Sequence, residues 1–160
     1  PLMKPIKTNA MRILDAMEIP YRVLAYTLPE GEAFSGEAVA TALDMDPDRC
    51  LKSLCAQGAD GRFLLFVVPV AEVLDLKKAA RAAGEKRVEL AHTKDLKAIT
   101  GYERGSVSPI GLKKPYPVFV DETATLFDSV AVSGGAKGVS VQLRTEDLAR
   151  ASGAKFADLI

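Results

Sequence analysis

The strongest strand signal of the chain lies in residues 50–69, CLKSLCAQGADGRFLLFVVP. This stretch contains two apolar runs, residues 50–56 and 63–69, and the second is rich in Phe and Val, which favour strands. Between the runs lies a short segment of Gln, Gly, Ala and Asp, which has the composition of a hairpin loop. The stretch therefore predicts two strands joined as an antiparallel hairpin.

Helices and further strands are predicted on both sides of this hairpin. Toward the N-terminus, apolar spacing and turn residues predict a helix capped by Thr8, a strand at 21–26 and a helix beginning at Ser35. Toward the C-terminus they predict helices at 73–83, 93–99 and 145–151, strands at 87–90, 118–121, 130–132 and 139–143, a turn at 133–138, and an irregular stretch at 101–117. This order lacks the regular alternation of a doubly wound sheet. We therefore expect either a mixed sheet or a distorted barrel, with flanking helices.

Length and composition fit a single domain. A chain of 160 residues, 48% of them hydrophobic, can bury a core without metal or disulfide support. Pro1 and Leu2 precede Met3, so we regard them as vector-derived and expect one domain over residues 3–160. No run approaches the roughly 20 apolar residues that cross a bilayer, and two cysteines are too few for a disulfide framework. These features predict a soluble, cytoplasmic protein that does not bind membranes.

The charge is balanced overall but uneven along the chain. The 21 basic and 21 acidic residues argue against a protein that wraps nucleic acid by bulk electrostatics. Residues 77–114, however, hold ten Lys or Arg against four Asp or Glu, a net charge of +6. Two interpretations remain open for this segment: scattered solvated charges, or a basic face with salt-sensitive affinity for phosphates.

Most familiar catalytic arrangements are missing from the sequence. Cys50 and Cys55 point to opposite faces of a strand, and with His92 as the single histidine they do not supply the ligands that zinc needs. The glycine-rich run at 134–138 lacks the spacing of a phosphate-binding P-loop and is more typical of a β-turn. Lys52 is unusual because it lies inside an apolar strand. It either discourages association at a sheet edge or faces a pocket.

Seven short motifs occur in order along the chain. They are Lys7-Thr8-Asn9-Ala10, Leu51-Lys52-Ser53-Leu54, Leu74-Asp75-Leu76-Lys77-Lys78, Thr100-Gly101-Tyr102, Gly105-Ser106-Val107-Ser108-Pro109, Val132-Ser133-Gly134-Gly135 and Lys155-Phe156-Ala157-Asp158. Each motif is short, but their order and spacing together are specific. On these motifs the chain, from Lys7 to Asp158, resembles the YbaK/EbsC family of the aminoacyl-tRNA editing superfamily.

The resemblance implies an α+β fold with a mixed, barrel-like β-sheet flanked by helices. It also implies a pocket, free of metal and of cofactors, that accepts the aminoacylated 3′ end of tRNA. It implies catalytic roles for Lys52, Gly105 and Ser106. Lys52 would anchor a phosphate or the developing negative charge, and the backbone N–H groups of the loop would hold the carbonyl oxygen of the ester. The substrate-binding residues implied are Tyr26, Phe34, Ser53, Ser108, Pro109, Gly134, Gly135 and Ser140. The resemblance thus favours the pocket interpretation of Lys52.

Two positions depart from the family pattern. Ser140 stands where family members such as YbaK carry an aspartate, and Gly105-Ser106 stands where a Gly-Gly pair is common. Both departures bear on which amino acid the protein removes from tRNA and on the rate of that hydrolysis. Asp121 or Asp128 could supply a carboxylate in place of the missing one, although an ordinary turn role is the more frequent one for such residues.

The resemblance implies hydrolysis of mischarged aminoacyl-tRNA, above all Cys-tRNA(Pro). The implied partners are the tRNA 3′ end and prolyl-tRNA synthetase, and DNA is not among them. No His, Asp or Glu in the motifs is an evident general base, so we expect the cysteinyl thiol to attack its own ester carbonyl. Two alternatives stay open: a deacylase for Ala-, Ser- or Thr-tRNA, and a non-catalytic module that holds tRNA ends.

Overall fold

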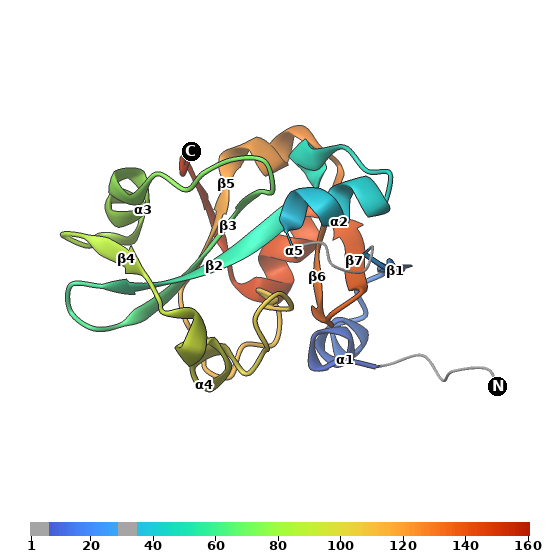
Figure 1. Cartoon of the computed structure of the whole chain (residues 1–160), viewed down its shortest axis with the longest axis horizontal. Coiled ribbons are helices and arrows are strands. Elements are labelled where there is room, and N and C mark those ends of the chain that lie inside the picture. The colour runs from blue at the N-terminus through green and yellow to red at the C-terminus, as the bar shows by residue number, and fades with distance from the viewer. Residues whose placement is uncertain (1–6, 29–34) are drawn as a thin grey trace.

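Two β-sheets form the frame of the protein (Figure 1). The computed structural model describes residues 7–28 and 35–160. The larger sheet contains, in spatial order, β4 (Val88–Leu90), β2 (Leu51–Gly58), β3 (Phe63–Pro69), β5 (Val118–Asp121) and β8 (Lys155–Ala157). The smaller sheet contains β1 (Arg22–Ala25), β7 (Val139–Arg144) and β6 (Ser129–Ala136), all antiparallel. In the larger sheet β2 is antiparallel to its neighbours, whereas β3, β5 and β8 run parallel, so the sheet is mixed as predicted.

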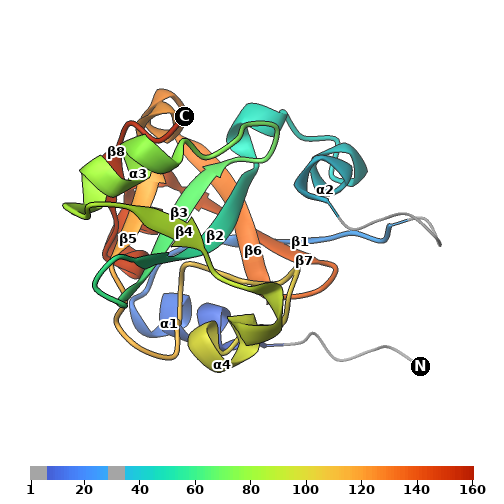
Figure 2. The same ribbon diagram turned by 60° about the vertical axis from the view of Figure 1, so that its left-hand side comes forward.

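Five α-helices surround the sheets within the described residues. They are α1 (Asn9–Ala16), α2 (Gly36–Ala42), α3 (Leu76–Ala83), α4 (Leu96–Thr100) and α5 (Thr145–Ser152). Short 3-10 turns occupy residues 47–49, 93–95 and 122–126. Figure 2 shows α3 and the C-terminus at the same end of the larger sheet, where the Lys78 ammonium donates to the carbonyl of Ile160. Over residues 7–28 and 35–160, no helix is long and apolar enough to cross a bilayer.

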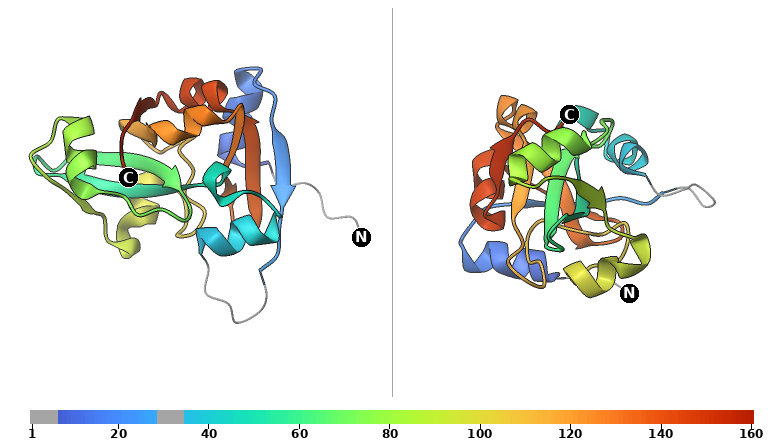
Figure 3. Two further views of the ribbon diagram at one scale, coloured as in Figure 1. Left: turned by 90° about the horizontal axis from the view of Figure 1, so that it is seen from above. Right: turned by 90° about the vertical axis from the view of Figure 1, so that its left-hand side faces the viewer.

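The two sheets join at one point without closing into a barrel. Their strands run in different directions, as the view from above shows (Figure 3, left). The contact is a parallel bridge between Cys50, just before β2, and Ala131 of β6. The fold is therefore α+β with a barrel-like arrangement of two sheets, which agrees with the sequence-based expectation.

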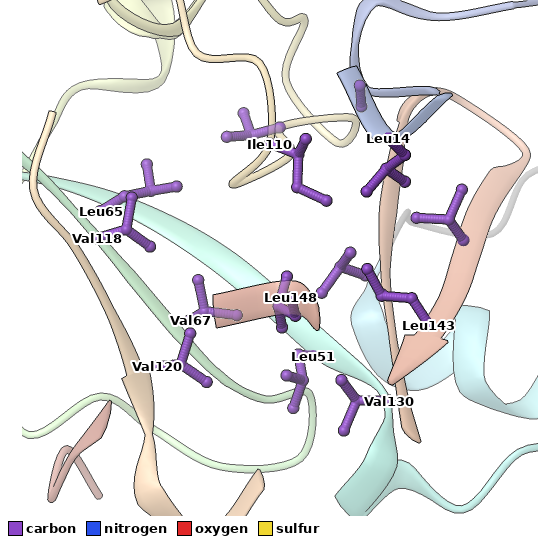
Figure 4. Packing of buried hydrophobic residues seen from close by; sticks show 14 of the residues in the cluster. Leu14, Leu51, Leu65, Val67, Ile110, Val118, Val120, Val130, Leu143 and Leu148 are labelled. Carbon is purple, nitrogen blue, oxygen red and sulfur yellow. The ribbon is translucent and has the colours of Figure 1, made fainter. Parts of the chain in front are cut away.

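The main hydrophobic core fills the space between the two sheets (Figure 4). Alternation along each strand sends every second apolar side chain into this space, including Leu65 and Val67 of β3 and Val130 of β6. Helix α1 contributes Leu14 and α5 contributes Leu148, and neither side chain is exposed to solvent. Burial of these side chains fixes the orientation of the two sheets, and with it the place where a pocket can form between them.

The outer face of the larger sheet carries a second core. Phe66 of β3 and Phe119 of β5 lie on it with their rings stacked at 5.6 Å between centroids. Helix α3 covers this face with Ala79 and Ala80, whose small side chains let the helix lie close to the sheet. The larger sheet is thus covered on both faces, as its continuous apolar strands require.

Some predicted elements have other bounds than expected, and some observed elements were not predicted. The helix predicted at 73–83 begins at Leu76, because Asp75 caps it, and Val73 is exposed. The turn predicted at 133–138 is only Lys137–Gly138, because β6 extends through a bulge to Ala136. The strand β8 and the 3-10 turn at 122–126 were not predicted.

Candidate functional site

A pocket of about 160 Å³ lies where the two sheets meet. Its walls come from the start of α2, the first half of β2, helix α4, the loop before β5 and the strands β6 and β7. The lining residues are Tyr26, Gly36, Val39, Cys50, Leu51, Lys52, Ser53, Val70, Leu96, Gly105, Val107, Ala131, Val132, Ser133 and Ser140. The volume is about ten times what one enclosed water needs, so a small aminoacyl group fits.

Lys52 reaches the pocket because of where β2 exchanges partners. The residue pairs with Val68 of β3 on one side, but β4 pairs with β2 only from Ala56 to Gly58. The other side of β2 near Lys52 is therefore left to the smaller sheet, which the strand approaches at Cys50. The side chain of Lys52 is half-buried, and no carboxylate of the described chain forms a salt bridge with it. Its positive charge thus faces the pocket without a counter-ion from residues 7–28 or 35–160.

The loop opposite Lys52 makes a tight turn. The N–H of Ser106 donates to the carbonyl oxygen of Glu103 at 3.0 Å, and Gly105 has φ 84° at the third position of that turn. A positive φ at this position is what a type II turn requires, and glycine adopts it without steric cost. Within the described chain, the N–H groups of Gly105 and Val107 have no hydrogen-bond acceptor. Both residues line the pocket, so two backbone N–H groups without an acceptor belong to its wall.

Ser133 of β6 and Tyr102 hold this loop in place. The hydroxyl of Ser133 donates to the carbonyl oxygen of Ser106 at 2.9 Å and accepts from the N–H of Gly135 at 3.1 Å. The buried phenol of Tyr102 donates to the carbonyl oxygen of Ile110, and its burial raises the pKa of the phenol to about 12. Tyr102 therefore remains a hydrogen-bond donor at any ordinary pH.

Several residues implied by the family resemblance do meet in the pocket. Tyr26 enters from the end of β1, Ser53 from β2 and Ser140 from β7, beside Lys52 and Gly105. The hydroxyl oxygen of Ser53 is buried and is the one such side-chain atom in the described chain without a hydrogen-bond partner. A buried hydroxyl without a partner is costly, and a ligand in the pocket could supply that partner.

Other implied residues lie outside the pocket. Ser106 lies behind the turn, and its hydroxyl also donates to Glu103. Ser108 and Pro109 are buried, and the Ser108 hydroxyl accepts from the N–H of Ile110. These three residues therefore support the shape of the loop without lining the pocket. Phe34 lies outside the described residues.

Gly134 and Gly135 also lie outside the pocket, in the bulge of β6. A Cβ on Gly134 would come within 2.9 Å of Cγ1 of Val139, and one on Gly135 would come within 2.8 Å of the Tyr102 ring. The two glycines are thus required for close packing of the hairpin. Their role in substrate binding stays a prediction.

The pocket lining is weakly polar and holds no described acid or base other than Lys52, Tyr26 and Cys50. Burial raises the pKa of the Cys50 thiol to about 11 and also raises the pKa of Tyr26, so both are neutral near pH 7. Neither Asp121 nor Asp128 replaces the carboxylate absent at Ser140. Asp121 accepts from the N–H of Leu159 and from Thr123, and Asp128 lies beside a different hollow.

Sequence reasoning missed the apolar walls and one polar residue. Gly36, Val39 and Val70 form a wall because the chain packs closely there, and a Cβ on Gly36 would come within 2.7 Å of Cγ1 of Val70. Ser133 was part of a recognised motif but was not assigned to the site. The signal that could have identified it is its position opposite Ser140, since a cross-strand pair in β6 and β7 shares one face.

Comparison with known proteins identifies the family. The model of the aminoacyl-tRNA editing domain matches residues 30–151. EbsC of Enterococcus faecalis, provisionally named a Cys-tRNA(Pro)/Cys-tRNA(Cys) deacylase, is 38% identical over 153 residues, 96% of this chain and 93% of the relative. A proline–tRNA ligase of Bacillus licheniformis is 30% identical over 124 residues, which are 77% of this chain and 21% of the ligase. A crystal structure provisionally described as a trans-editing enzyme for prolyl tRNA synthetase shares 27% identity and a TM-score of 0.79, covering 97% of this chain and 98% of that one. The chain therefore belongs to the aminoacyl-tRNA editing domain family.

Proposed function

We propose that this protein hydrolyses the ester bond of Cys-tRNA(Pro), acting in the cytoplasm as one domain over residues 3–160. The observation that carries the proposal is the pocket that brings the unpaired cation of Lys52 together with the free N–H groups of the Gly105 loop. The family supplies the class of substrate, an aminoacyl-tRNA. The provisional name of the Enterococcus relative supports cysteine as the amino acid.

The chemistry follows from the charge that develops during ester cleavage. Attack on the ester carbonyl gives a tetrahedral intermediate whose oxygen is negative, and N–H donors or cations aimed at that oxygen stabilise it. We assign this role to the N–H groups of Gly105 and Val107, and we assign to Lys52 the developing charge or the neighbouring phosphate. The N–H of Ser106 already donates within the turn, so Val107 takes the place first predicted for Ser106.

The nucleophile comes from the substrate in this proposal. No described residue of the lining is a carboxylate or a histidine, the usual general bases. The sulfur of the cysteinyl group bonds to its own carbonyl carbon, the C–O bond to the ribose breaks, and the thiol proton passes to the ribose oxygen. Water then hydrolyses the released thiolactone away from the tRNA.

This route accounts for selectivity that a small pocket does not supply. Fit alone separates side chains of such similar size by only about 1–3 kcal/mol. Serine and alanine enter a pocket that accepts cysteine, but neither carries a thiol. Selection by reactivity therefore adds to selection by size.

The test compares the intact protein on Cys-, Ser-, Ala- and Thr-tRNA(Pro) at fixed salt, with spontaneous hydrolysis as the baseline. The proposal predicts fast loss of cysteine and near-baseline rates for the other esters. Serine and alanine cleaved as fast as cysteine would refute substrate assistance. A preference for one of those esters would assign the protein to a sister deacylase, the outcome expected if Ser140, which lines the pocket, reshapes it. Tight tRNA binding without hydrolysis of any ester would make it a binding module.

We also propose prolyl-tRNA synthetase as the partner that delivers the substrate. Support comes from the ligase relative, in which a similar domain occupies about a fifth of one chain. We propose that the editing domain described here also acts together with the synthetase. Deacylation of Cys-tRNA(Pro) should therefore speed up when catalytically inactive synthetase is added at micromolar concentration. Identical rates with and without it would exclude this dependence.

A further inference from the structure

We propose that a basic groove beside the pocket binds the phosphates of the single-stranded 3′ end of tRNA. The residues of this basic groove that matter here are Lys97, Glu103, Arg104, Ser106, Gly135 and Lys137. The inference rests on the proposed function for the identity of the nucleic acid, and it adds the path by which that substrate lies on the surface.

The basic groove and the pocket share their walls. Helix α4 gives Leu96 to the pocket and Lys97 to the groove. The turn gives Gly105 to the pocket, while Arg104 and Ser106 on either side of it line the groove. Strand β6 likewise gives Ser133 to the pocket, and its end lines the groove. Residues adjacent in the sequence therefore line the two hollows, which lie side by side along α4, the turn at Gly105 and β6.

The charge of the basic groove suits a phosphate chain. Lys97, Arg104 and Lys137 are exposed and positive, and Glu103 is the one described carboxylate of the lining. Glu103 pairs with Lys97 at 3.0 Å. Arg104 and Lys137 form no salt bridge with any residue of 7–28 or 35–160, so both charges are available to a ligand. Lys97 and Arg104 belong to the basic segment 77–114 of the sequence, so part of that segment lies next to the site.

The two available cations are mounted on rigid backbone. Arg104 precedes Gly105 in the type II turn, which Ser133 ties to β6. Lys137 lies in the two-residue turn between β6 and β7, where Gly138 has φ 79°. Because the backbone that carries these two cations is already ordered, binding a phosphate there does not require a loop to fold first.

The 3′ end is the part of tRNA that matches this geometry. The ester lies on the terminal ribose of the tRNA. When the aminoacyl group occupies the pocket, the phosphates next to that ribose therefore lie near the wall that the pocket shares with the basic groove. Positively charged grooves are how proteins follow the backbone of single-stranded nucleic acid, and the nucleotides next to the ester are single-stranded. Tyr102, the aromatic residue of the groove, is buried, so charge and not base stacking dominates.

The test measures the binding of uncharged tRNA(Pro) by fluorescence anisotropy over a series of salt concentrations. The double variant Arg104→Ala/Lys137→Ala is compared with the intact protein and with Arg81→Ala/Lys155→Ala, which removes two exposed cations outside the groove. The groove variant should bind about 5- to 25-fold more weakly. Its slope of log K against log salt should be shallower by about 1.4, since each single-strand phosphate contributes about 0.7. Equal slopes in the two double variants would overturn the proposal.

Two further measurements define the source of the phosphates and separate this inference from the proposed function. A tRNA that lacks its single-stranded 3′ nucleotides should bind the intact protein and the groove variant equally, and a persisting difference would overturn the 3′-end assignment. Cysteinyl adenosine, which has no phosphate, should be hydrolysed at the same rate by both. If no ester is hydrolysed at all, the proposed deacylase fails, while the salt slopes and the truncated tRNA still decide whether the groove binds the 3′ end.

Discussion

Gly105 is the residue whose backbone the proposed chemistry depends on. Its φ of 84° costs an alanine about 1–2 kcal/mol, and Gly84, with φ 69° at the end of α3 and open space around it, offers a matched control. We expect Gly105→Ala and Gly84→Ala to lose similar stability in thermal unfolding. Only Gly105→Ala should also slow deacylation, by about 100-fold, because it shifts the donors that face the carbonyl oxygen. Equal rates for the two variants would contradict the role of the loop.

The sequence predicted several of the residues that meet in the pocket, but it did not predict the packing of the two sheets that brings them together. Strand alternation sends Lys52 and Ser53 to opposite faces, yet Cys50, Leu51, Lys52 and Ser53 all line the pocket. The reason is that this half of β2 lies at the junction of two sheets, and the pocket reaches around the strand. A contact of that kind depends on β6, about 80 residues later in the sequence, so no local pattern encodes it.

Helix α1 is tied to the hairpin of the smaller sheet through its N-cap. The buried hydroxyl of Thr8 accepts from the N–H of Met11 at 3.2 Å and donates to the carbonyl oxygen of Gly134 at 2.6 Å. Thr8→Ala should lower the free energy of unfolding by about 1–2 kcal/mol, because it removes the cap and leaves a buried carbonyl unpaired. Thr8→Ser, which keeps the hydroxyl, should lose much less in urea denaturation. Equal losses would show that the methyl group and not the hydroxyl matters.

Helix α3 should show a pH-dependent contribution from its own cap. The carboxylate of Asp75 accepts from the N–H groups of Lys78 and Lys77, and these bonds lower its pKa below the ordinary value. A carboxyl whose pKa is lower in the folded state stabilises the protein above its unfolded pKa, near 4, and loses that effect as the pH falls through the folded value. Asp75→Asn, which keeps a capping side chain, should therefore melt below the intact protein at pH 6. The gap should close near pH 2, and a gap of equal size at both pH values would contradict this account.

The elements that were predicted well are those whose signal is local. Strand β3 was predicted over its full range because its apolar run ends at Pro69. Strand β8 was missed because three residues, Lys155–Ala157, carry little pattern of their own and become a strand only by pairing with β5. The bulge of β6 was missed for a similar reason, since Gly134 and Gly135 look like a turn until Tyr102 and Val139 are packed against them.

The arrangement of two sheets that meet without closing accounts for the position of the pocket. A closed barrel would fill its interior with side chains, whereas here the junction at Cys50 and Ala131 leaves space between β2 and the smaller sheet. The Gly105 loop and α4 then border that space on the side where the basic groove begins. The protein is neutral overall, yet in this way it places positive charge next to the site. The rest of its surface should then bind tRNA only weakly.

The most direct test of the central claim is the single-turnover rate of Cys-tRNA(Pro) deacylation by the intact protein and by Lys52→Ala, with enzyme in excess and salt fixed. Lys86→Ala, which removes an exposed lysine outside the pocket, is the matched control. The account predicts a loss of about 100-fold or more for Lys52→Ala with an unchanged melting temperature, and full activity for Lys86→Ala. Hydrolysis by Lys52→Ala at the rate of the intact protein would contradict it.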